Sequence, residues 1–254
     1  MIVEGAVVLH DAGKLPPIDK PAFHQIRMIE RFAQCSGLDL NSLKVADIGC
    51  NLGQMCYELK RRYPQCEVHG VDEYRTTEHD GHFHYHAADI SRRFPLEDNS
   101  MDVVFALEVL EHMIDTDHFL DECWRVLKPG GWLALSTPNI NELRNRILVP
   151  LGYYPHWLEY RIHDFHVRLY NAKMLKTHLK DRGFELKELI GSNVLPLRWV
   201  LKEGFLCGVS DRFSRWFPGL AAGLFSLSTK PVSGQRQVKE LNRQPSAPLT
   251  SASS

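Results

Sequence analysis

The stretch KVADIGCNLGQ, residues 44–54, decides the fold, because a short apolar run passes directly into a glycine turn. Residues 45–48 are typical of a buried strand, with the acid Asp47 near its end. Gly49 and Gly53 follow, and glycines at such a turn let the backbone approach a ligand closely. The stretch therefore predicts a strand, a ligand-binding turn and a helix, in that order.

Three kinds of ligand are compatible with a glycine turn of this type. A phosphate-binding P-loop requires Lys followed by Ser or Thr after its glycines, and Gln54 and Met55 stand there instead. A dinucleotide turn requires the pattern GxGxxG, but Asn51 and Gln54 occupy its second and third glycine positions. The third ligand is a nucleoside without phosphates, in which Asp47 faces a positively charged group. We favour this third interpretation and keep the dinucleotide turn as a weak alternative.

The rest of the chain alternates strands with helices. We expect helices at 22–35 and 54–63, in a stretch that includes 119–127, and at 171–183, and strands at 45–48, 67–72, 82–89, from 101, 132–137, 184–190 and 224–229. The helix that includes 119–127 is expected to end at the turn KPGG, residues 128–131. This alternation predicts a doubly wound α/β domain whose mostly parallel sheet is covered by helices on both faces.

Composition indicates a soluble globular chain. Its 254 residues are 44% hydrophobic and 24% charged, and the formal net charge of -1 gives no reason to expect a nucleic-acid partner. The six cysteines are scattered without a CxxC pair, so we interpret them as reduced thiols. The first residues lack a basic region before their apolar run, and we expect a cytoplasmic protein without a membrane span.

The motifs after the turn supply a family resemblance. VADIGCNLG, residues 45–53, resembles the first motif of class I S-adenosylmethionine-dependent methyltransferases. Asp72, Asp89 with Ile90, the segment LEVLEHM (107–113) and the segment LKPGGWLALSTPN (127–139) follow in the family's order. The resemblance covers roughly residues 43–190. It implies a seven-stranded, Rossmann-like sheet and S-adenosylmethionine as the cofactor.

The resemblance also implies which residues hold the cofactor. In such enzymes an acid at the position of Asp72 accepts the ribose hydroxyls, and one at the position of Asp89 meets the adenine edge. Asn51 departs from the family's frequent glycine, but Asn tolerates left-handed backbone better than most residues. The full implied set is Asp47, Gly49, Cys50, Asn51, Gly53, Asp72, Glu73, Asp89, Ile90, Leu107 and Glu108.

The acceptor is less well defined by sequence. The chain lacks the Asn/Asp-Pro-Pro-aromatic turn of DNA and protein-amide methyltransferases after the fourth strand. EVLEHM, STPN and HDFHVRLYN are similar to the group that contains the ubiquinone-biosynthesis O-methyltransferases. This similarity implies methylation of a hydroxyl on a small molecule, a sugar or a lipid-linked acceptor. The alternatives are a non-catalytic, cofactor-binding relative and a nucleotide-dependent oxidoreductase.

The candidate catalytic residues are His112, His163 and His166. If 108–112 were helical, Glu108, Glu111 and His112 would share one face at the carboxyl ends of the strands. His112 then has a pKa suited to accepting a hydroxyl proton. Alternatively, Glu108, Glu111 and His112 bind a divalent metal together with His163 or His166, as similar motifs do in some methyltransferases. A third interpretation is that Glu108 lines the cofactor pocket while His112 packs or caps. Our prediction is a metal-free site with a histidine base.

Two insertions and the ends complete the domain plan. We expect a helical segment at 1–42, the main domain at 43–230, and a disordered polar tail at 231–254. Residues 139–170 and 192–223 interrupt the alternation and are predicted to form a cap over the acceptor, with a small satellite core as the alternative for the first. Residues 192–223 could form a lid, a dimer surface or a helix that contacts a membrane. Membrane contact is considered because the aromatic residues of this segment alternate with Arg198, Lys202, Arg212 and Arg215. The oligomeric state is left open.

Overall fold

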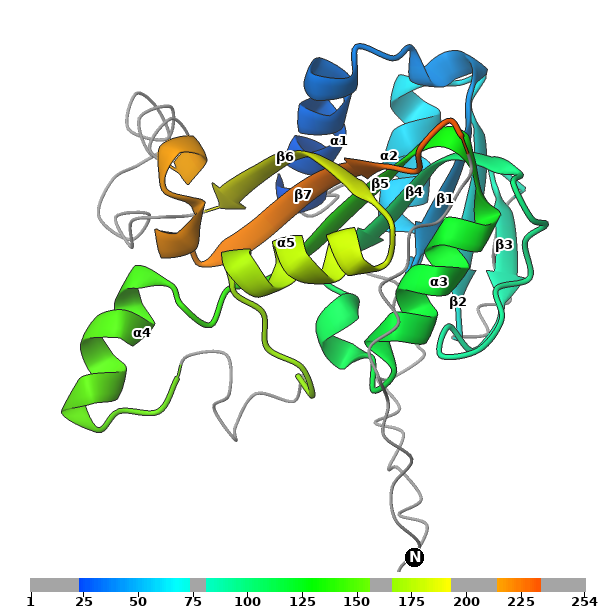
Figure 1. Cartoon of the computed structure of the whole chain (residues 1–254). Helices are drawn as coiled ribbons and strands as arrows, with labels where there is room; N and C mark the ends of the chain where they lie inside the picture. Colours follow the sequence, from blue (N-terminus) through cyan, green and yellow to red (C-terminus); the bar gives the residue numbers. More distant parts are fainter. Residues whose placement is uncertain (1–22, 74–80, 156–165, 193–213, 234–254) are drawn as a thin grey trace, which may run out of the picture.

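The computed structural model describes residues 23–73, 81–155, 166–192 and 214–233 (Figure 1). Within these residues lies one seven-stranded sheet in the order β3-β2-β1-β4-β5-β7-β6. Strands β1 to β5 pair in parallel, whereas β7 is antiparallel to both β5 and β6. The predicted mostly parallel, seven-stranded sheet is therefore confirmed. The strands are β1 (Lys44–Ile48), β2 (Glu67–Asp72), β3 (His84–Ala87), β4 (Met101–Leu107), β5 (Leu127–Pro138), β6 (Glu185–Ser192) and β7 (Gly223–Thr229).

Helices cover both faces of this sheet (Figure 1). One apolar cluster joins α1 and α2 to one face, and a second joins α3 and α5 to the other. Helix α4, in contrast, lies apart from the sheet (Figure 1). The doubly wound prediction is thus correct. The α-helices are α1 (Phe23–Ser36), α2 (Gln54–Arg62), α3 (Thr116–Val126), α4 (Leu143–Leu148) and α5 (Ala172–Asp181), and the short 3-10 helices are η1 (Leu40–Ser42), η2 (Leu110–His112), η3 (Val149–Leu151) and η6 (Pro218–Leu220).

Side-chain caps fix where the two main outer helices begin. The Asp115 carboxylate accepts the backbone N–H of His118 at the start of α3 over 3.0 Å. The Asn171 side chain accepts the N–H of Met174 at the start of α5 over 2.9 Å. Both residue types satisfy the unpaired N–H groups of a first helical turn. The beginnings of α3 and α5 are therefore set locally by sequence.

Helix α3 ends at Val126, just before KPGG, so the predicted stop of this helix is confirmed. The segment itself, however, does not form a turn between α3 and a strand, because β5 already begins at Leu127 and contains it. The Gly130 N–H donates to the Lys230 carbonyl over 2.9 Å, and the Lys230 N–H donates to the Gly131 carbonyl over 2.9 Å. A partner about a hundred residues away along the chain thus extends the strand, which a local turn signal cannot reveal.

The remaining predictions on chain organisation are only partly covered. Of the second insertion, residues 193–213 lie outside the described part, and so do 156–165 of the first and 234–254 of the tail. The five cysteines in the described part carry free thiols. Among the described helices, none is long and apolar enough to cross a membrane.

Candidate functional site

The turn between β1 and α2 has no room for side chains at its two glycines. Gly49 and Gly53 both have φ of +77°, a left-handed conformation that favours glycine. A Cβ atom on Gly49 would lie 2.5 Å from Cγ2 of Val109, and one on Gly53 would lie 2.5 Å from Cζ of Phe83. Conformation and space therefore both require glycine at these positions.

An acid at the end of β2 holds this turn in place. The Asn51 N–H donates to Oδ2 of Asp72 over 2.7 Å, and the Gly49 N–H donates to the Val71 carbonyl over 2.8 Å. Asn51 itself has φ of +48°, in the left-handed region that Asn tolerates. The turn and the carboxyl end of β2 thus form one hydrogen-bonded unit, with the Asp72 carboxylate beside the exposed backbone of Asn51.

Asp47 is a buried acid directly below the turn. It is 4% exposed, and burial raises its pKa to about 7. The nearby negative charge of Asp72 raises the pKa further, while a hydrogen bond from the Cys56 thiol opposes the shift. A carboxyl group in this position is stabilised in its charged form by a cation brought near it.

The other predicted cofactor residues follow neighbouring strand ends. After β3, Asp89 is half exposed, and the N–H and hydroxyl of Ser91 donate to its Oδ1 over 2.9 and 2.6 Å. The hydroxyl bond is the main reason why the pKa of Asp89 lies below its usual value. Ile90 packs against the α3 side of the core, Leu107 against the α2 side, and Glu73 is exposed after β2. Because the carboxyl ends of parallel strands share one edge of the sheet, these residues lie along that edge.

Glu108 is not helical, which corrects our sequence interpretation of residues 108–112. It has φ of +56°, and helical hydrogen bonding is confined to the short η2. The Glu108 N–H donates to the carbonyl and Oγ of Ser136, each over 3.1 Å, and Oγ of Ser136 donates back to its carboxylate. The end of β5 therefore holds Glu108 in a strained backbone conformation of the kind that clusters at functional sites.

Glu111 is a buried carboxyl group with one oxygen left unsatisfied. It is 1% exposed, and the Thr137 hydroxyl donates to its Oε2 over 3.0 Å. Among the described residues, its Oε1 is buried without a hydrogen-bond partner. Burial, followed by the neighbouring Glu108 carboxylate, raises its pKa to about 8. A buried acid of this kind requires a proton or a cation.

His112 and His166 lie beside Glu111, although they are far apart in sequence. The Glu111 carbonyl accepts the N–H groups of Val167 and Arg168 over 2.9 and 3.0 Å, which brings the end of the first insertion to η2. The two imidazole rings have centroids 4.9 Å apart at 57°. One ligand atom from each of Glu111, His112 and His166 lies within 4.8 Å of the others. One carboxylate and two imidazoles form a donor set that suits a divalent cation.

The first insertion, which is predicted to form a cap over the acceptor, is described only in part. Candidate His163 and the aromatic and basic residues Trp157, Tyr160 and Arg161 lie outside the described residues. Tyr170 is buried in the core, where its hydroxyl bonds Nδ1 of His178 over 2.9 Å, so it does not belong to an acceptor lid. Two other tyrosines of the first insertion, Tyr153 and Tyr154, are exposed.

Two site residues had no assigned role in the sequence prediction. Ser136 and Thr137, at the end of β5, hold Glu108 and Glu111 respectively. Both belong to the STPN segment, which was recognised as a motif. The signal was therefore present, but only the pairing of β4 with β5 shows which acids these hydroxyls contact.

Comparisons with known proteins show the family of this chain. Residues 46–135 match the model of a methyltransferase domain. A ubiquinone biosynthesis O-methyltransferase of Nitrobacter winogradskyi is 30% identical over 209 residues, which cover 75% of this chain and 78% of that relative.

Solved structures share the fold. Phosphoethanolamine N-methyltransferase 2 of Haemonchus contortus, in complex with S-adenosyl-L-methionine, has 19% identity and a TM-score of 0.54, covering 82% of this chain and 52% of that one. A SAM-dependent methyltransferase of Archaeoglobus fulgidus has 18% identity and a TM-score of 0.55, covering 83% and 95%.

Proposed function

Because the chain belongs to the class I S-adenosylmethionine-dependent methyltransferases, we propose that it methylates a hydroxyl group of a small-molecule, sugar or lipid-linked acceptor. The observation that carries this proposal is the group formed by Glu111, His112 and His166 at the end of β4. This group lies at the same sheet edge as the cofactor turn, where a reacting hydroxyl has to be held. The O-methyltransferase relative supports the hydroxyl as acceptor.

The residues of the turn fit the cofactor. S-adenosylmethionine supplies an activated methyl group on a positively charged sulfonium. Gly49 and Gly53 keep side chains out of the turn, so that the backbone can contact a nucleoside. Asp72 offers a carboxylate to the ribose hydroxyls, and buried Asp47 provides the negative charge that a nearby cation stabilises.

Methyl transfer by displacement depends on alignment and on removal of the hydroxyl proton. The rigid backbone at Glu108 and the Thr137 bond to Glu111 fix the orientation of the acceptor side. His112 and His166 offer imidazole nitrogens that can accept a proton.

The buried Glu111 oxygen supports a metal form of this site. A divalent cation held by Glu111, His112 and His166 would satisfy that oxygen and lower the pKa of an acceptor hydroxyl. Our sequence prediction was a metal-free site with His112 as base. We now propose the cation-bound form, which sequence analysis had kept as an alternative.

The proposal is tested by methyl transfer from labelled S-adenosylmethionine across a panel of phenols, catechols, sugars and lipid-linked hydroxyl compounds. We expect turnover with at least one hydroxyl acceptor, and His166→Ala should lower it while cofactor affinity by calorimetry stays unchanged. Transfer to amines alone would contradict hydroxyl methylation. Tight cofactor binding without transfer to any acceptor would instead support the non-catalytic alternative.

A further inference from the structure

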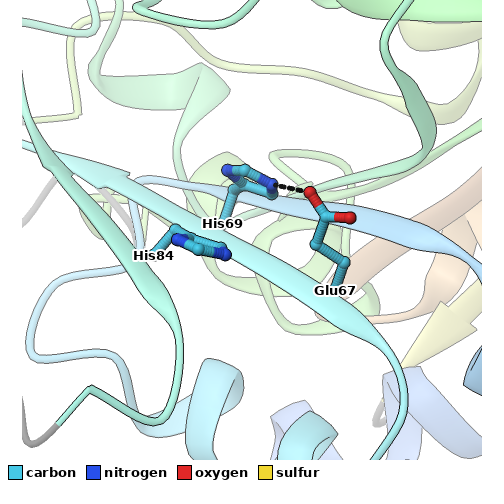
Figure 2. A group of neighbouring side chains, drawn as sticks. All are labelled: Glu67, His69 and His84. Carbon is cyan, nitrogen blue, oxygen red and sulfur yellow. Dashed lines mark hydrogen bonds and ion pairs between the residues drawn. The ribbon is translucent and has the colours of Figure 1, made fainter.

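A second group of metal-type side chains lies on β2 and β3, away from the acceptor site. In the parallel pairing of these strands, His69 is the register partner of His84. Because alternate residues of a strand point to the same face, Glu67 and His86 share that face. Figure 2 shows Glu67, His69 and His84 converging from the two strands. From sequence, this histidine-rich tract is predicted only to be a strand.

The distances are close to those of a metal site. One ligand atom from each of Glu67, His69 and His84 lies within 4.8 Å of the others. Nε2 of His69 is 3.0 Å from Oε1 of Glu67, and the rings of His69 and His84 stack with centroids 4.8 Å apart. Ligand atoms around a tetrahedral zinc ion are about 3.4 Å apart, given bonds of about 2.0–2.1 Å. Small side-chain rotations would therefore complete the arrangement.

His86 provides support for the central ligand. Its Nε2 is 3.0 Å from Nδ1 of His69, and the two rings are nearly parallel at 11°. Because the Glu67 carboxylate can only accept, Nε2–H of His69 donates to it in the absence of an ion. When an ion replaces that proton, Nδ1–H of His69 can donate to Nε2 of His86. Ligating histidines usually have such a partner on their other ring nitrogen.

One cation competes for the carboxylate of this group. It is Lys44, whose Nζ lies 2.9 Å from Oε1 of Glu67. The Lys44 side chain is about half exposed, so it can move into water when an ion binds.

We propose that Glu67, His69 and His84 bind one divalent metal ion of the kind that prefers imidazole ligands, such as Zn²⁺, with water as a further ligand. Two imidazoles among three protein ligands favour Zn²⁺, Ni²⁺ or Cu²⁺ over the oxygen-preferring Mg²⁺ and Ca²⁺. Among the strands of the described part, β3 lies at one edge of the sheet, next to β2. The ion joins these strands, of which β2 ends at Asp72 and β3 leads to Asp89.

The test uses the full chain, stripped with EDTA, desalted and titrated with Zn²⁺ by calorimetry and by thermal unfolding. A His166→Ala background disables the group at η2, so that the two sites are measured separately. In that background we expect Zn²⁺ to raise the melting temperature with one tight site. His84→Ala and Glu67→Gln should weaken this site at least tenfold, and His86→Ala should weaken it about 10- to 100-fold.

The matched control is His82→Ala, which removes a histidine from the same tract whose ring contacts Tyr57 instead. It should bind Zn²⁺ like its parent. Because His84 is exposed, its replacement leaves the core intact, which circular dichroism would verify. Equal Zn²⁺ affinity in His84→Ala, Glu67→Gln and the parent would overturn the proposal. The methyl-transfer proposal and the zinc-site proposal can be tested separately. If His166→Ala loses methyl transfer but still binds Zn²⁺ at Glu67, His69 and His84, the two groups act independently.

Discussion

The backbone N–H of Asn51 and the Asp72 carboxylate are joined by a 2.7 Å hydrogen bond that ties the turn after β1 to the end of β2. The same carboxylate fixes the glycine turn and, in the proposed function, accepts the ribose hydroxyls of the cofactor. A hydrogen bond to a charged group is worth roughly 1.5–3 kcal/mol. Loss of this acid should affect cofactor binding through both contacts.

Asp72→Ala should weaken S-adenosylmethionine binding by at least about tenfold, because charge-assisted hydrogen bonds are lost. Isothermal calorimetry measures the affinity, and circular dichroism confirms that the variant is folded. Asp72→Asn is the matched control, because it keeps an acceptor for the Asn51 N–H and removes only the charge. The S-adenosylmethionine affinity of Asp72→Asn should lie between that of the wild type and that of Asp72→Ala. Wild-type affinity in Asp72→Ala would remove this residue from the cofactor site.

Gly49→Ala should destabilise the fold more than Gly81→Ala does. Both glycines have φ of +77°, but a Cβ at Gly81 meets nothing within 4 Å, whereas at Gly49 it meets Val109 at 2.5 Å. Gly81→Ala should thus show only the backbone cost of about 1–2 kcal/mol. Chemical denaturation measures both, and calorimetry should show weaker cofactor binding for Gly49→Ala alone. Equal effects would mean that Val109 moves aside.

Asp47 should make the stability of the ligand-free protein depend on pH. Burial raises its pKa from 3.8 to about 7, so the folded chain holds the proton more tightly than the unfolded chain. Its contribution to the free energy of unfolding is therefore greatest at low pH and decreases as pH rises from about 4 to about 7.

Asp47→Asn removes this titration. The melting temperature of the variant relative to wild type should therefore increase between pH 5 and pH 8, while its affinity for S-adenosylmethionine falls. Melting curves of both proteins across this range cancel the contributions of other groups. A constant difference would show that Asp47 stays ionised in the ligand-free fold.

EDTA should abolish methyl transfer if Glu111, His112 and His166 hold a cation, and a divalent transition ion such as Zn²⁺ or Mn²⁺ should restore it. Glu111→Gln and His166→Ala should each lower turnover by at least about a hundredfold without weakening cofactor binding. His84→Ala controls for the second group of histidines and should remain active and EDTA-sensitive. Full activity in EDTA would instead support a histidine base without a metal.

The chain end beyond Ser233 is predicted to contribute little to stability, because its sequence has few apolar residues. Truncation after Ser233 should leave the melting temperature and cofactor affinity nearly unchanged. Lys230→Ala is the contrasting variant, because the buried Lys230 ammonium donates to the carbonyls of Trp124 and Leu127. It should lower the melting temperature clearly. A large decrease on truncation would show that the tail is structural.

The sequence predicted the elements whose signals are local. The strand at 67–72 has the expected bounds, because alternating burial and flanking turns define it along the chain. Glu108 and KPGG were interpreted wrongly, because contacts from β5 and from Lys230 override their local preferences. His69 and His84 were overlooked for a related reason. Fifteen positions apart, they become neighbours only through the register of β2 with β3.

The antiparallel direction of β7 has a practical consequence for handling the protein. Gly223 pairs with Pro138 at the cofactor edge, and Thr229 pairs with Trp132 at the opposite edge. The described chain therefore leaves the sheet, at residues 230–233, on the side away from the carboxyl edge of the parallel strands. A protein truncated after Ser233 and tethered to a sensor chip through a tag at that point should present the carboxyl edge to the flowing solution.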